Sequence, residues 1–79
     1  MSQHPGGTLG PDIERFDYDG SGNLIYVGIA HPKELTTEAV WQIRKFAYDG
    51  SGNLLSALYA EGSKKFEHIW DNRAALTYL

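Results

Sequence analysis

The sequence contains no cysteine, only three prolines and a single methionine. The lack of cysteine excludes disulfide bridges and thiolate metal sites as sources of stability. This exclusion matters because a chain of 79 residues forms one small domain, and such a domain buries only ~60–65% of the surface that its unfolded chain exposes. A core of that size often supplies only ~3–5 kcal/mol. We therefore expect a partner chain to provide further stability.

Basic side chains and long apolar runs are also scarce. Seven Lys and Arg residues against ten Asp and Glu residues give a formal net charge of −3, which argues against a nucleic-acid phosphate binder. No apolar run approaches the ~20 residues of a membrane helix, so we expect neither nucleic acid nor membrane as a partner. Residues 1–11 lack the pattern of a secretory signal. Their glycines and prolines predict a flexible N-terminal arm, followed by a single β domain over residues 12–79.

An internal repeat is the most informative feature of the chain. Residues 13–30 read IERFDYDGSGNLIYVGIA, and residues 43–60 read IRKFAYDGSGNLLSALYA. The two copies share 10 of 18 aligned residues, counted from these two rows. A repeat with this spacing indicates a repeated structural unit. Two copies are too few for a solenoid, but they predict the same local structure twice.

Each copy predicts a β-hairpin. The flanks are rich in Ile, Val, Phe, Tyr and Leu, which favour strands. Between them lies Asp-Gly-Ser-Gly-Asn, in which glycine permits positive φ and Asp and Asn bond their own backbone. The predicted turn residues are Asp19, Gly20, Gly22, Asn23, Asp49, Gly50, Gly52 and Asn53. We therefore predict an all-β fold: a small antiparallel sheet or sandwich built from two duplicated hairpins.

The strand patterns predict that both sheet faces are partly buried. Ile25, Val27 and Ile29 alternate with Leu24 and Tyr26, so apolar residues fall on both faces of the second strand. This pattern fits packing against a partner.

The chain outside the repeats needs a separate interpretation. A helix from Glu38 to Phe46 is rejected, because residues 43–48 repeat the strand-like residues 13–18. Residues 66–73, FEHIWDNR, fit one short helical turn, with apolar residues at helical spacing. Residues 74–79 are predicted as a last, short strand.

The segment Asp17 to Leu24 resembles the first half of an EF-hand calcium loop. Asp17, Asp19 and Ser21 fall at ligand positions 1, 3 and 5, but position 12 is Gly28 instead of the required bidentate Glu. The second copy begins with alanine where the first ligand belongs. A polar hairpin turn is the favoured interpretation, and a calcium-stabilised β domain stays as an alternative.

Other chemistry-bearing patterns are absent from the sequence. The three histidines form no metal-binding pair, and no nucleophile elbow is present. The glycine-rich turns lack the Lys-Ser/Thr of a phosphate-binding loop. We therefore expect no catalysis, no cofactor and no small-molecule substrate.

Aromatic residues are abundant for so small a chain. Some must form the core, but Tyr and Trp are also enriched in interface hot spots. Two roles stay open for the aromatic residues: packing in the core alone, or packing in the core together with contacts to a partner. A sheet of two hairpins also leaves edge strands whose unpaired backbone groups can join subunits, so we expect a homo-oligomer. The predicted interface or fold-pinning residues are Trp41, Tyr59, Phe66, Trp70, Asp71, Arg73 and Tyr78.

Two resemblances to known families follow from these motifs. The turns, Tyr18 to Leu24 and Tyr48 to Leu54, resemble the Tyr-Asp-x-x-Gly-x-Leu pattern of YD repeats in Rhs-type toxin shells. Residues 26–79, with Trp41-x-Ile43-x-Lys45 and Phe66-x-x-Ile69-Trp70-Asp71-x-Arg73-x-x-Leu76-x-Tyr78, resemble small virion structural proteins of tailed bacteriophages.

The phage resemblance implies a non-enzymatic structural protein that assembles in many copies, as capsid decoration or as a tail or neck component. Its implied partners are other virion proteins, and its implied location is the virion, with the host cytoplasm during assembly. Trp70, Asp71 and Arg73 are expected to pin the tail. A ligand- or receptor-binding β module of a tail fibre is the alternative.

Overall fold

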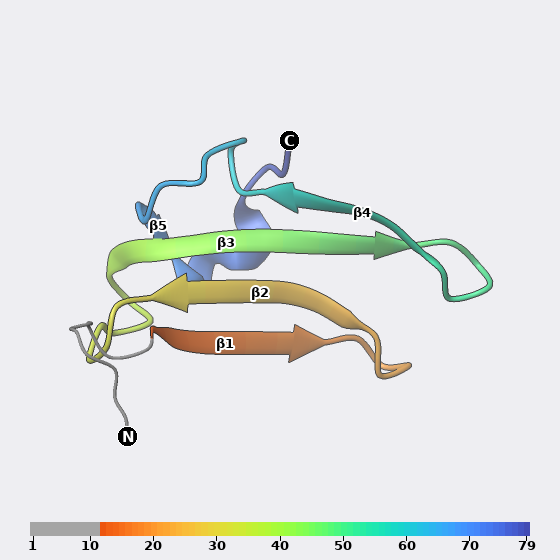
Figure 1. Ribbon diagram of the computed structural model, residues 1–79, viewed down its shortest axis with the longest axis horizontal. Helices are drawn as coiled ribbons and strands as arrows, with labels where there is room; N and C mark the ends of the chain where they lie inside the picture. Colours follow the sequence, from red (N-terminus) through yellow and green to blue (C-terminus); the bar gives the residue numbers. More distant parts are fainter. Residues whose placement is uncertain (1–11) are drawn as a thin grey trace, which may run out of the picture.

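The computed structural model describes residues 12–79, so the predicted arm at residues 1–11 lies outside the described residues. The backbone forms one antiparallel sheet in the order β1-β2-β3-β4, which confirms the predicted all-β fold (Figure 1). A fifth, short strand pairs with β3. The elements are β1 (Ile13–Tyr18), β2 (Leu24–Ala30), β3 (Ala39–Tyr48), β4 (Leu54–Tyr59), β5 (His68–Ile69) and the 3₁₀ helix η2 (Trp70–Ala75).

The two sequence repeats form two hairpins of the same geometry. In each hairpin the register shifts before the turn, and one extra residue, Ile25 or Leu55, is accommodated as a bulge. In each turn the Asp backbone N–H donates to the Asn carbonyl at 2.9 Å. Gly22 and Gly52 both adopt a φ of 87°, a conformation that favours glycine.

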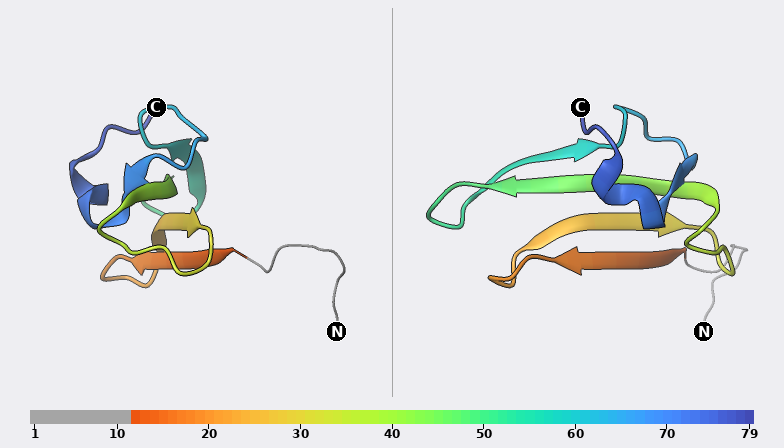
Figure 2. Two further views of the ribbon diagram at one scale, coloured as in Figure 1. Left: turned by 90° about the vertical axis from the view of Figure 1, so that its left-hand side faces the viewer. Right: turned by 180° about the vertical axis from the view of Figure 1, so that it is seen from behind.

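The two faces of the sheet differ because only one of them is covered. Residues 66–79 cross one face, where η2 packs behind the sheet in the view of Figure 1 and in front of it in the right-hand view of Figure 2. No other part of the described chain crosses the opposite face (Figure 1). We call these the covered face and the open face.

The core lies between the sheet and the C-terminal segment. Trp41 and Ile43 of β3 are fully buried, and the Trp70 ring packs against Trp41 with ring centroids 5.9 Å apart. The cluster is completed by Tyr26, Ala30 and Ala60. Val27, which points to the open face, is also buried, and Ile25 and Ile29 are half-buried. Apolar burial on both faces therefore agrees with the strand pattern.

The predicted bounds of the C-terminal elements were wrong. Residues 66–73 do not form one helical turn: His68 and Ile69 are extended and pair with Ala39 and Trp41 of β3, and the helix begins only at Trp70. Backbone pairing with β3 overrides the helical spacing of the apolar residues. The predicted strand over residues 74–79 is reduced to a single bridge between Ala60 and Tyr78, because η2 extends to residue 75.

Candidate functional site

Arg73 links the C-terminal segment to the first strand. Its Nε donates to the Asp17 carboxylate at 3.1 Å, and its Nη1 donates to the Trp70 carbonyl at 3.2 Å. The guanidinium carbon also lies 4.5 Å from the centre of the Trp70 ring. This geometry combines an ion pair with a cation–π contact. Arg73 thereby holds η2 against the covered face.

Asp71 and Tyr78 make further contacts to the chain itself. The Asp71 carboxylate accepts a hydrogen bond from the Thr36 hydroxyl at 3.4 Å. The Tyr78 hydroxyl donates to the Arg73 carbonyl at 2.7 Å, and its ring lies 5.8 Å from that of Tyr26. Burial raises the pKa of Tyr78 to about 12, with Tyr26 adding to the shift and the Arg73 charge opposing it. These side chains fasten the C-terminal segment onto the sheet.

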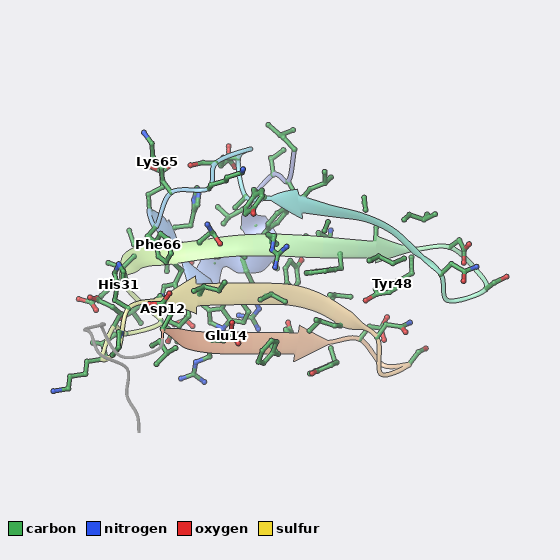
Figure 3. The ribbon with its side chains drawn as sticks, viewed as in Figure 1. Asp12, Glu14, His31, Tyr48, Lys65 and Phe66 are labelled. Carbon is green, nitrogen blue, oxygen red and sulfur yellow. The ribbon has the colours of Figure 1, made fainter. Side chains whose placement is uncertain are left out.

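Tyr59 and Phe66 lie apart from this cluster, Tyr59 on the open face and Phe66 at the end of the sheet. Arg44, which is opposite Tyr59 in the register, places its guanidinium carbon 5.8 Å from the Tyr59 ring and 5.4 Å from the Phe46 ring. Phe66 stacks on His31 with centroids 5.2 Å apart. Figure 3 shows this pair at the end of the sheet far from the hairpin turns. The structure therefore separates Tyr59 and Phe66 from the other five predicted residues.

The carboxylates of the two turns are satisfied by the turns themselves. Asp19 accepts from the backbone N–H groups of Ser21 and Asn23 at 2.8 and 2.9 Å, and Asp49 repeats both bonds at the same distances. Hydrogen bonds, foremost the one from the Asn backbone four residues on, lower the pKa of both Asp side chains. These are the bonds of an Asx turn.

Internal contacts engage two of the three side chains at the ligand positions of the calcium-loop resemblance. Asp17 binds Arg73, and Asp19 accepts the turn donors. Within residues 12–79, no group of three or more His, Cys, Asp or Glu side chains is placed to hold a metal ion. The local geometry is that of a hairpin turn.

The sequence interpretation missed the exposed apolar side chains of the two edge strands, β1 and β4. The exposed fractions of these side chains range from 40% at Leu58 to 66% at Leu55. The C-terminal segment packs near the end of the sheet far from the hairpin turns, which project beyond it (Figures 1 and 2). These five side chains, which we call the apolar end, are Phe16 and Tyr18 on β1 and Leu54, Leu55 and Leu58 on β4, the two opposite edges of the four-stranded order. The uncharged sequence of β4, LLSALY, was the signal that could have found it.

The two edge strands of the sheet differ sharply in charge. β1 reads IERFDY and carries Glu14, Arg15 and Asp17, whereas β4 carries no charged residue. Charged side chains protect an edge strand from pairing with another chain. Of these two edge strands, only β4 combines exposed apolar side chains with a lack of charge.

Comparison with protein-family models, with curated proteins and with solved structures gives no match for this chain. Among residues 12–79, no helix is long and apolar enough to cross a membrane. The interpretation of the site consequently depends on its geometry and on the sequence resemblances.

Proposed function

We propose that this chain is a non-enzymatic structural protein of a bacteriophage particle, which assembles in many copies as capsid decoration or as a tail or neck component. The resemblance of residues 26–79 supports the phage assignment. The observation that supports an assembly role is the apolar end, which leaves five large apolar side chains at least 40% exposed.

The physical argument concerns the balance between a small core and a large exposed apolar surface. The buried core has only seven residues. Each large apolar side chain that becomes fully buried contributes ~1.5–3 kcal/mol to stability. Covering the apolar end with a partner would therefore add stability comparable with part of the core. Three of these side chains, Leu54, Leu55 and Leu58, lie on the single edge strand β4, and exposed apolar groups of this kind mark interaction sites. The proposed partners are other copies of the chain and other virion proteins.

A receptor- or glycan-binding module is the second candidate, since the Tyr18 ring is 57% exposed beside the first turn. A sugar site combines an aromatic face with convergent polar groups. Here the nearest polar groups, Asp19 and Asn23, are hydrogen-bonded to each other within the turn. The geometry therefore supports the structural role better than sugar binding.

The test is the protein content of purified particles. Virus particles would be isolated on a density gradient from the culture that carries the gene, and the chain would be quantified against a particle protein of known copy number. The proposal expects many copies per particle. Recovery of the chain only in the unassembled fraction would contradict it.

A further inference from the structure

We infer that β4 is a self-association strand: the β4 edges of two copies pair antiparallel about a twofold axis and join their sheets into one continuous sheet. This inference rests on the proposed function and names the surface through which copies meet. The partner is a second copy of this chain, and the contact is a closed, isologous one.

The backbone of β4 offers hydrogen-bonding groups at its outer edge. Ala60 donates its N–H to the Ile43 carbonyl at 2.9 Å. In an antiparallel ladder, residues that bond the neighbouring strand alternate with residues whose N–H and C=O point away. Ala57, three residues before Ala60 and opposite Phe46 in the register, therefore directs its backbone groups away from β3. An added strand would satisfy these groups.

The C-terminal tail already uses the far end of this edge. Leu79 donates its backbone N–H to the Tyr59 carbonyl at 3.1 Å, and Glu61 donates to the Thr77 carbonyl at 2.6 Å. The tail thus hydrogen-bonds to the outer side of β4 at Tyr59. The part that the tail leaves uncovered is Leu54–Leu58, and this uncovered part limits where a second copy can pair.

The charges select β4 over the other edge. Pairing through β1 would bring Glu14 and Arg15 into an interface, and it would do so beside the Asp17 carboxylate, which already binds Arg73. Burying such charges without good partners is costly. Pairing through β4 buries no charged side chain of that strand. For a chain with a net charge of −3, an uncharged contact also avoids repulsion at the interface.

The side chains of β4 are compatible with pairing against a second copy. Pairing requires outward-pointing residues to face outward-pointing residues. The register with Ala57 on the twofold axis meets this condition, because the outward-pointing backbone groups of Ala57 then face those of Ala57 in the second copy. Ser56 then lies opposite Leu58 of the second copy, which is 40% exposed here. Such a cross-strand neighbour covers part of the leucine side chain.

The experiment measures native mass by light scattering after size exclusion, on the full chain over a dilution series. Ala57→Pro removes the outward N–H of β4, and edge strands tolerate proline at such a position. Glu14→Pro is the matched control on the edge of β1. We expect the wild type and Glu14→Pro to show a dimer, or a larger assembly built from dimers. Ala57→Pro should dissociate, with a dissociation constant raised at least about tenfold.

A second variant keeps the test valid if Ala57→Pro does not fold, as judged by circular dichroism. Leu55→Lys places a charge at the most exposed leucine of β4 and should also favour the monomer. Hydrogen exchange gives a direct readout, because the Ala57 amide should be protected in concentrated samples and exchange faster on dilution. Equal dissociation of Ala57→Pro and Glu14→Pro would overturn the inference, as would open-ended fibres or a wild type that is monomeric throughout the series.

These outcomes separate the inference from the proposed function. A chain that is abundant in particles but monomeric in solution would retain the structural role and overturn pairing through β4. A chain that dimerises through β4 but is missing from particles would retain the pairing and overturn the virion role.

Discussion

Gly28 and Leu58 occupy the same position in the two copies of the repeat, yet only Gly28 faces Trp70. A Cβ atom at Gly28 would collide with Cε3 of the Trp70 ring and lie 2.6 Å from Cζ3. Leu58 lies in the other hairpin and is 40% exposed. Asp17 and Ala47 also occupy the same position in the two copies, and only Asp17 has a carboxylate, which binds Arg73. At these two positions the first copy contacts the C-terminal segment, and there the two copies carry different residues.

We expect Gly28→Ala to lower the free energy of unfolding by about 1–3 kcal/mol, the usual cost of forcing extra atoms into a packed core. Urea denaturation followed by tryptophan fluorescence would measure the change. Gly20→Ala is the control, because nothing lies within 4 Å of the added atom, and its effect should stay within about 0.5 kcal/mol. Equal effects of the two substitutions would contradict the packing explanation.

The two hairpins are the elements that determine the shape of the sheet, and their turns have the same hydrogen bonds. In each turn an Asp carboxylate accepts backbone donors two and four residues on. These bonds favour the ionised form and lower the pKa of Asp19 and Asp49 in the folded state. The folded chain therefore binds fewer protons than the unfolded chain when these groups titrate.

This difference predicts a loss of stability in acid that originates in the turns. The contribution of Asp19 and Asp49 is present above their ordinary pKa of 3.8, and it is lost as the pH falls through the lowered pKa of the folded state. The double variant Asp19→Asn with Asp49→Asn should show a shallower decline. Urea unfolding of both proteins over a series of acidic pH values would measure it. Parallel pH profiles would refute this role of the turns.

At the scale of the whole molecule, the covered face is closed by the chain's own tail, whereas no other part of the described residues 12–79 crosses the open face. Trp41 and Trp70 pack between the sheet and η2, and Arg73 connects η2 to β1 through Asp17. The fold is thus stabilised by contacts between residues far apart in sequence, and these contacts leave the turn end of the sheet uncovered.

The arrangement also predicts how the whole chain responds to calcium. Asp17 is paired with Arg73 and Asp19 with its own turn, so calcium would have to compete with the Arg73 charge and the turn donors for these carboxylates. We expect the same melting temperature in calcium and in chelator, measured by circular dichroism. A rise in calcium that chelator reverses would instead support the calcium-stabilised alternative.

The local features of this protein were predictable from its sequence. Alternating β-branched and aromatic residues around Asp-Gly-Ser-Gly-Asn determine a hairpin through short-range geometry, so a repeated sequence predicts a repeated hairpin. The strand-like assignment of residues 43–48 followed from the same reasoning. These predictions depend on neighbours within a few residues of each other.

The arrangement of the hairpins and the tail was decided only by the tertiary structure. The sequence did not predict that β2 and β3 would be central, which leaves the charged β1 and the uncharged β4 as edges. It predicted helical spacing at His68 and Ile69, where pairing with β3 imposes a strand. The need for glycine at position 28 arises from a ring 42 positions away, counted from 28 to 70. Contacts at such separations depend on how the elements pack, and local sequence preferences do not encode them.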